Sequence, residues 1–254
     1  MSKIGVIMST YNGKERIDNS IKSILEQSYT DFKLIICDDG STDGTYEYLK
    51  NKYNKNEKIY IFQNNNKNGL AYALNLCLNY CKDCEYIARM DDDDFSYPNR
   101  FKEQIEFLEN NPNISFVGSN VDIYDGEKII EERKLIAYPQ KKDFIWNSPF
   151  VHPAIMFRYT PLKESDFYRV SKETLRGQDY DLFMRMYSRG FKGANIQKNL
   201  LRYTENNKTK KKRTFKVRLG ECKVRRIGFK KMGIIWYAFP FILKPLVAYV
   251  KDHI

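Results

Sequence analysis

The sequence contains few histidines and cysteines and none of the common nucleotide-binding signatures. Only two histidines occur in 254 residues, and the Cys81-x-x-Cys84 pair has no second pair with which to build a zinc site. Neither the glycine-rich dinucleotide fingerprint nor the P-loop motif is present. These absences argue against a zinc protein, a dinucleotide-dependent enzyme of the usual fold and a P-loop enzyme.

Long apolar runs are also missing. Residues 4–8 are too short for a secretory signal, and with an odd count of five cysteines we expect reduced thiols and a cytoplasmic protein. Residues 233–250 are apolar and aromatic, but Pro240, Lys244 and Pro245 interrupt them. Because a spanning helix needs about 20 mostly apolar residues, we expect an interfacial or re-entrant helix pair there.

The net charge of +11 is concentrated at the C-terminus. Residues 205–254 hold 14 Lys and Arg but only 3 Asp and Glu, which leaves the preceding residues neutral. We therefore expect a domain over residues 1–205 and a basic helical extension over residues 206–254.

The composition of the extension indicates its partner. Aromatic residues among the basic ones favour an anionic membrane surface, bound through residues 208–254 on the inner face of the cell membrane. Nucleic acid is not expected, because a nucleic-acid tail would not require the apolar run. Alternatively, the extension packs on the domain or on a second subunit, so that a homo-oligomer forms.

Strands and helices alternate through the first ninety residues, with one strand and one helix about every 30 residues. This pattern predicts an α/β fold in which a mostly parallel, Rossmann-type sheet is flanked by helices. The loops after parallel strands gather along one edge of the sheet, so we expect a polar crevice of nucleotide size there. The predicted strands are residues 3–9, 32–37, 59–62 and 86–90, followed by the polar loops 10–13, 38–45, 63–69 and 91–94.

Beyond residue 90 the pattern is less regular. A helix is predicted after Pro98, followed by strands over residues 114–124 and 151–157. Residues 160–176 have no clear periodicity and are expected to be irregular. A helix with one apolar face is predicted over residues 179–187.

Four consecutive carboxylates, Asp91 to Asp94, follow the apolar run of residues 86–90. Like charges in a row repel one another and raise each other's pKa values, so a fold rarely keeps them for stability. A divalent cation relieves this repulsion, and Mg²⁺ and Mn²⁺ prefer carboxylate oxygens. We interpret the run as a metal site at the end of a buried strand, the alternative being a solvated acidic turn.

Other polar residues that follow the predicted strands are candidates for nucleotide contacts. Asp38 or Asp39 is expected to accept a hydrogen bond from a nucleobase, and the alternative is an Asx turn that caps the next helix. Tyr11 is placed to stack on a base, or packs on its neighbours. Asn68 begins a helix whose N-terminus attracts phosphate, or is an ordinary cap. The calcium-loop spacing from Asp39 onward has Lys50 in place of the acidic twelfth residue, so calcium binding is not expected.

Asp179 and Asp181 stand at the start of a predicted helix, after an irregular segment. Carboxylates there complement the positive end of the helix dipole. A carboxylate in this position is equally suited to act as a general base.

Five motifs, taken in order, resemble those of glycosyltransferase family 2, whose enzymes have the GT-A fold and include bacterial ones that build surface polysaccharides. The resemblance covers about residues 3–205. Each motif alone is weak, but five in order are specific. They are Ser9-Thr10-Tyr11-Asn12, Asp38-Asp39-Gly40-Ser41-Thr42-Asp43-Gly44-Thr45, Asn68-Gly69-Leu70-Ala71, Arg89-Met90-Asp91-Asp92-Asp93-Asp94 and Gln178-Asp179-Tyr180-Asp181-Leu182.

The resemblance implies an inverting transfer of a hexose from a nucleotide sugar, usually a UDP-sugar, to a hydroxyl of a glycan or lipid-linked acceptor. Asp179 matches the family's catalytic base. Asp91 and Asp93 match its DxD motif, with Asp91 toward the nucleotide and ribose and Asp93 toward Mn²⁺ or Mg²⁺ on the diphosphate. The positions that line the nucleotide sugar are matched by Thr10, Tyr11, Asn12, Asp39, Asn68, Asp91 and Asp92.

Two residues depart from the family pattern. Gln178 stands where many relatives have Glu, which leaves open any role of a neighbouring acid in acceptor binding. Asp92 stands where a small residue is usual, so Asp92 or Asp94 is an alternative metal ligand. The competing functional hypotheses are a catalytically inactive nucleotide-sugar-binding module and a polyanion-binding protein that acts through its basic tail.

Overall fold

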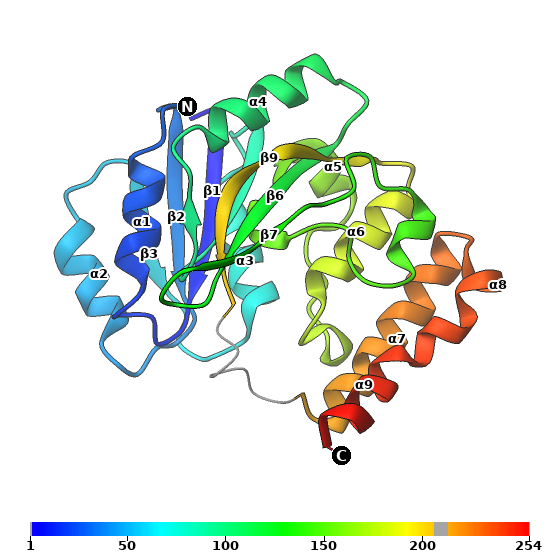
Figure 1. The fold of residues 1–254 in the computed structure, drawn as a ribbon. Helices are drawn as coiled ribbons and strands as arrows, with labels where there is room; N and C mark the ends of the chain where they lie inside the picture. The colour runs from blue at the N-terminus through cyan, green and yellow to red at the C-terminus, as the bar shows by residue number, and fades with distance from the viewer. Residues whose placement is uncertain (1, 206–212, 254) are drawn as a thin grey trace.

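The computed structural model describes residues 2–205 and 213–253. Its first half is the predicted parallel sheet, with strands in the order β3-β2-β1-β4 and helices in the connections between them (Figure 1). The α/β fold class is therefore confirmed. The strands are β1 (Ile4–Thr10), β2 (Phe32–Asp38), β3 (Ile59–Gln63) and β4 (Tyr86–Asp91), and the helices are α1 (Ile17–Leu25), α2 (Thr45–Tyr53) and α3 (Leu70–Leu78).

The second half extends this sheet with strands of both directions. Strand β8 (Met156–Arg158) is antiparallel to β4 and to β6 (Phe116–Tyr124), so β6 runs in the same direction as β4. Strand β9 (Gly193–Thr204) is parallel to β6 and reaches back to the short β5 (Phe95–Ser96), which follows the acidic run. The edge strand β7 (Ile129–Arg133) forms a hairpin with β6.

Alternate side chains of the central strands enter two hydrophobic cores, one on each face of the sheet. Val6 and Met8 of β1 pack on the face covered by α1 and α4 (Arg100–Asn110). Ile7 packs on the opposite face, which α3 and α6 (Gln178–Ser188) cover. The sheet is therefore buried on both sides, and the polar loops that follow its parallel strands lie at one edge.

Three sequence-based expectations differ from the structure. Residues 151–157 do not form one strand, because Pro153 lacks a backbone N–H and lies in a 3₁₀ turn (His152–Ala154) before the short β8. Helix α5 (Tyr159–Glu164) begins the segment expected to be irregular. The long strand β9 was not predicted, although it completes the site described below.

The C-terminal helices pack on α6 and share its core (Figure 1). Phe229, on α7 (Phe215–Lys231), is fully buried, and the chain passes so close to α6 that a Cβ at Gly228 would lie 2.3 Å from the Met184 sulfur. Among the described residues, no helix is long and apolar enough to cross a bilayer. The remaining elements are α8 (Ile235–Ala238), a 3₁₀ helix (Phe239–Leu243) and α9 (Lys244–His253).

This packing predicts that α7 contributes to the stability of the whole chain. Phe229→Ala should lower the free energy of unfolding by about 3–5 kcal/mol, because it leaves a cavity in a core shared with α6. Trp236→Ala, on the 91% exposed Trp236, is the matched control and should change it by less than about 0.5 kcal/mol. Denaturant unfolding measures both. Equal effects would mean that α7 does not share the core.

Candidate functional site

The loops after β1 and β2 are joined at the carboxyl edge of the sheet. The amide of Asp39 donates to the carbonyl of Thr10 at 2.9 Å, and the amide of Asn12 donates to the Ser41 hydroxyl at 2.8 Å. Asn12 adopts the left-handed conformation with φ of 51°, and its side-chain oxygen accepts from the Thr42 amide at 2.9 Å. Asn12 therefore links the two loops, whatever its part in ligand binding.

Asp39 ties the loop after β3 to the end of β2. One oxygen accepts from the Asn68 amide at 3.0 Å and the Asn64 side chain at 3.1 Å, and the other accepts from the Gly69 amide at 2.7 Å. Asp39 thus positions the start of α3. The predicted helix start at Asn68 and the predicted nucleobase acceptor are in direct contact.

The neighbouring Asp38 has a free acceptor atom. Its Oδ1 accepts from the Ser41 amide at 2.8 Å, whereas its Oδ2 is buried and has no hydrogen-bond partner among the described residues. An unpartnered buried carboxylate oxygen is costly unless a ligand supplies a donor. Of the two aspartates, Asp38 is therefore the better candidate to accept a hydrogen bond from a nucleobase N–H.

Tyr11 lies beside this pair of loops, and its ring is half-buried. The ammonium group of Lys67, from the loop after β3, lies 3.3 Å from the ring centroid. This cation–π contact holds the ring between the first and third loops. A planar ligand that stacks on Tyr11 would approach Lys67 as well.

Asp92 is separated from the other carboxylates of the acidic run. It is buried, and Arg16 pairs with it at 2.8 Å while the Thr10 hydroxyl donates to it at 2.5 Å. Asp92 and Thr10 therefore fix the loop after β1 against the end of β4. Both lie at the predicted site, but each is already paired within the protein.

The remaining three carboxylates converge. Oxygens of Asp91, Asp93 and Asp94 lie within 4.8 Å of one another. Burial and the charges of Asp91 and Asp93 raise the pKa of Asp94 well above its usual range, and its Oδ2 has no partner among the described residues. Three carboxylates with an orphaned buried oxygen match the donor set that Mg²⁺ and Mn²⁺ prefer, so the residues fit such an ion.

Two further residues, Thr204 and Arg89, contact this carboxylate group. The amide of Thr204, at the end of β9, donates to Asp94 Oδ1 at 2.8 Å. Arg89, only 1% exposed, pairs with Asp91, while its Nε and Nη1 have no hydrogen-bond partner among the described residues. Sequence reasoning assigned no role to Arg89, although a charged residue within an apolar strand was the available signal.

Asp179 faces a cavity at the start of α6. The side chain is half-buried and lines a cavity of about 350 Å³ between α6 and the C-terminal helices. Burial raises the pKa of Asp179, and the nearby Arg89 partly opposes this shift. The charge of Arg89, which pairs with Asp91, therefore acts on the predicted base as well as on the predicted metal group.

Asp181 is not an equivalent candidate. It is 3% exposed, and its carboxylate pairs with Arg185 at 2.8 Å and with Arg169 at 2.7 Å. These ion pairs give Asp181 a structural role on the inner side of α6. Of the two carboxylates, Asp179 is the one that can meet a ligand.

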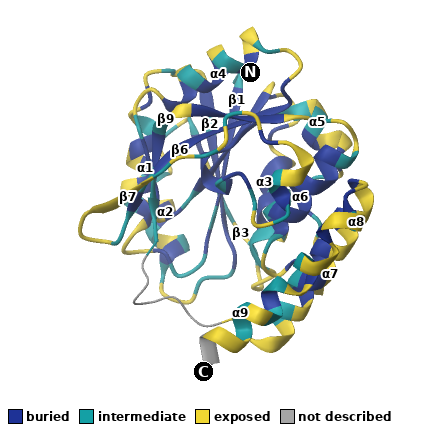
Figure 2. Ribbon diagram, turned by 45° about the vertical axis from the view of Figure 1, so that its right-hand side comes forward, coloured by how far each residue is buried: buried dark blue, intermediate teal, exposed yellow. Residues whose placement is uncertain are grey.

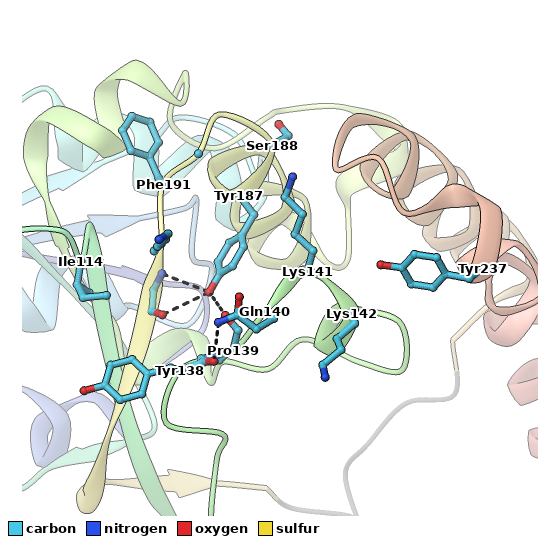
Figure 3. Close-up of a pocket in the computed structure, with 13 residues that line it drawn as sticks. Ile114, Tyr138, Pro139, Gln140, Lys141, Lys142, Tyr187, Ser188, Phe191 and Tyr237 are labelled. Atoms are coloured by element: carbon cyan, nitrogen blue, oxygen red, sulfur yellow. Dashed lines mark hydrogen bonds between the residues drawn. The ribbon is translucent and has the colours of Figure 1, made fainter.

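A cavity of about 540 Å³ lies at the other end of the sheet (Figure 3). Ile114 and Gly193 line it, and they stand at the starts of β6 and β9. Because β6 runs parallel to β4, these starts lie opposite the end that carries Asp91. The hydroxyl of Tyr187 is held by Pro139 and Gly193, and Tyr237 faces the cavity from α8. This cavity is too far from the carboxylates to be part of the same site.

Solved structures define the class of fold. The structure of S. aureus TarS 1-349 in complex with UDP-GlcNAc matches with a TM-score of 0.70 and 19% identity, over 91% of this chain and 66% of that chain. The mannosyltransferase PcManGT from Pyrobaculum calidifontis, in complex with GDP-Man and Mn²⁺, matches with a TM-score of 0.65 and 17% identity, over 98% and 75%. The fold is therefore GT-A-like.

Sequence comparisons define the family. The model of Glycosyl transferase family 2 matches residues 5–190, and this chain belongs to that family. EpsE of Bacillus subtilis (strain 168), which is named as a glycosyltransferase, is 33% identical over 246 residues, 96% of this chain and 88% of EpsE. WfaP of Escherichia coli, named as a UDP-Glc:alpha-D-GlcNAc-diphosphoundecaprenol beta-1,3-glucosyltransferase, is 30% identical over 212 residues, 77% of this chain and 74% of WfaP.

The carboxylate geometry predicts which aspartates hold a metal. Asp93→Asn and Asp94→Asn should each weaken Mn²⁺ binding at least about tenfold, because each removes a charged ligand from the converging group. Asp92→Asn should leave Mn²⁺ affinity nearly unchanged and lower the melting temperature instead, because it breaks the pair with Arg16. Electron paramagnetic resonance of free Mn²⁺ and thermal unfolding measure these effects. Loss of Mn²⁺ binding in Asp92→Asn alone would contradict the assignment.

Proposed function

We propose that the chain is an inverting, metal-dependent hexosyltransferase that moves a sugar from a nucleotide sugar to a hydroxyl of a glycan or lipid-linked acceptor in bacterial surface-polysaccharide synthesis. The observation that carries this proposal is the convergence of Asp91, Asp93 and Asp94 at the end of β4, beside the buried Arg89 that pairs with Asp91. Asp179, which lines a cavity at the start of α6, supplies the candidate base. The names of the relatives support the substrate class.

The donor is a nucleotide sugar, and a UDP-sugar is favoured. TarS is described in complex with UDP and UDP-GlcNAc, and WfaP is named for UDP-Glc. In this chain, Tyr11 offers a ring face and Asp38 an unpartnered acceptor, while Asp39, Asn12 and Asn68 hold the loops around them. A pyrimidine base has a stacking face and an N–H donor, which these groups match.

Asp91, Asp93 and Asp94 would hold Mn²⁺ or Mg²⁺. When bound, such an ion supplies the positive charge that a leaving diphosphate needs. Asp92 supports the nucleotide side indirectly, through Arg16 and Thr10. The buried Arg89 adds a fixed positive charge beside the same carboxylates.

Asp179 is the proposed general base. It accepts the proton of the acceptor hydroxyl as that oxygen attacks the anomeric carbon, on the face opposite the leaving diphosphate. A single displacement with the base opposite the leaving group inverts the anomeric centre. The raised pKa of Asp179 brings its basicity closer to neutral pH than that of an ordinary carboxylate.

The proposal predicts separate effects on chemistry and donor binding. Asp179→Asn should slow sugar transfer about 10²–10⁴-fold, because the proton acceptor is lost. Donor binding should be kept, because Asp179 lies outside the loops that surround Tyr11. Nucleotide release from a panel of nucleotide sugars with Mn²⁺ measures transfer, and calorimetry measures UDP binding. A chain that binds UDP-sugars but never transfers the sugar would instead be an inactive binding module.

The pH dependence of sugar transfer provides an independent test of Asp179 as the base. Because burial raises the pKa of Asp179, transfer should fall as pH decreases through this raised value, where the base becomes protonated. Asp166→Asn, which changes an exposed carboxylate paired with Arg189, should keep both the rate and the profile. An unchanged acid limb in Asp179→Asn would show that another group is the base.

We also propose that the C-terminal helices bind an anionic membrane surface. Trp236, Phe239 and Leu243 are 91%, 66% and 56% exposed, and Lys230 and Lys231 are exposed at the end of α7. Figure 2 shows exposed residues along α7, α8 and α9. Aromatic side chains favour the headgroup level, and basic residues near an anionic surface contribute about 1 kcal/mol each. The basic residues predicted at positions 208–212 lie outside the described residues.

If the C-terminal helices bind the membrane, removing exposed apolar side chains there should weaken vesicle binding, whereas removing similar side chains elsewhere should not. The double variant Trp236→Ala/Phe239→Ala should reduce binding to phosphatidylglycerol vesicles at least about tenfold, because two exposed aromatic side chains no longer insert. The double variant Ile129→Ala/Ile130→Ala removes side chains that are 51% and 48% exposed on β7 and should bind as the unchanged chain does. Vesicle sedimentation at physiological salt compares them. Equal binding by all three proteins would leave this face as an assembly surface.

A further inference from the structure

Two cations from the C-terminal helices line the same cavity as Asp179. Arg225 of α7, which is 7% exposed, donates to the carbonyls of Ile145 and Trp146, each at 2.9 Å. Lys244, the first residue of α9, donates to the same Trp146 carbonyl at 2.6 Å and to Asn147 Oδ1 at 2.9 Å. Both side chains line the cavity. Because they share one acceptor oxygen, the two charges are neighbours.

Neither cation has an acidic partner. Among the residues that the structure describes, no carboxylate lies within ion-pair distance of Arg225 or Lys244, and all their acceptors are neutral oxygens. Glu221, in the same cavity, already pairs with Arg213 and Arg218. Two adjacent, partly buried cations without a counter-ion destabilise each other. Burial and the charge of Arg225 lower the pKa of Lys244 to about 8, which reflects this cost.

The position of this pair identifies which substrate would meet it. Asp179 lines the cavity together with residues of α7 and α9, whereas none of the converging carboxylates Asp91, Asp93 and Asp94 lines it. In an inverting transfer, the acceptor reaches the base from the side opposite the leaving group. A molecule that fills the cavity is therefore placed as an acceptor.

We infer that this cavity binds the phosphate or diphosphate group of the acceptor, with Arg225 and Lys244 as its partners, so that the acceptor hydroxyl reaches Asp179. This inference rests on the proposed function. Arg and Lys are the residues that best bind phosphate oxygens, through charge-assisted hydrogen bonds. An acceptor in which a diphosphate joins a sugar to a lipid matches the residues on either side of these two cations. The sugar would face Asp179, and the lipid would meet two exposed apolar residues near Lys244 in the chain, Leu243 at the end of the 3₁₀ helix and Val247 on α9.

Inorganic pyrophosphate is the probe, used with the full chain in EDTA so that no metal holds it at the carboxylates. Lys244→Gln should raise the Kd for pyrophosphate at least about tenfold, because it removes one charged donor. Arg226→Gln is the matched control, since Arg226 is exposed on α7 next to Arg225 and has the same charge. It should bind pyrophosphate as the unchanged chain does, and melting temperatures confirm that both variants fold. Equal Kd values for the two variants would overturn the inference.

Two further measurements assign the anion to the acceptor. Saturating UDP with Mn²⁺ should not displace pyrophosphate from the cavity; displacement would show that the cations bind the donor diphosphate. Lys244→Gln should keep its binding to phosphatidylglycerol vesicles; a loss as large as that of Trp236→Ala/Phe239→Ala would make Lys244 a membrane headgroup contact instead.

Donor hydrolysis without pyrophosphate binding refutes this inference alone. Pyrophosphate binding at Lys244 without any sugar transfer refutes the proposed function and keeps the anion site.

Discussion

The ion pair between Arg16 and Asp92 is the interaction on which the carboxylate group depends. Four adjacent carboxylates cannot converge without strong repulsion. Arg16, at 2.8 Å, and the Thr10 hydroxyl turn Asp92 away, so that only three carboxylates meet. The turn leaves no space for a side chain at Gly13, because a Cβ there would lie 2.5 Å from Asp92 Oδ2. The loop after β1 therefore determines the shape of the group at the end of β4.

The sequence predicted the gathering of the strand-end loops because this follows from topology alone. Parallel strands joined by crossover helices have their carboxyl ends at the same edge of the sheet, and the polar runs marked those ends. The sequence did not show which three of the residues Asp91 to Asp94 converge, because this depends on Arg16, a residue 76 positions from Asp92. Similarly, the family resemblance pointed to Asp179 rather than Asp181, but the physical reason, the ion pairs of Asp181 with Arg169 and Arg185, is seen only in the structure.

Strand β9 was missed for a local reason. Its pairing with β6 is irregular near Ser119 and Asn120, opposite a polar stretch of β9, so no strict alternation of apolar and polar residues is present. The C-terminal extension was predicted from charge, but charge counts do not show burial. Arg225 contributes to the net charge, yet it is 7% exposed and faces neutral carbonyls.

The two cations of the cavity and the loops after the first strands come from different stretches of the chain. The family model ends at residue 190, whereas Arg225 and Lys244 lie beyond it. The region that the family model matches thus contains the proposed donor loops and Asp179, whereas the two cations proposed to meet the acceptor lie outside it. On the proposed function, the acceptor choice of this chain could therefore be changed through its C-terminal helices while the donor loops are kept. Exchanging these helices between relatives is accordingly a route to new glycosidic products, provided that the core shared with α6 is exchanged to match.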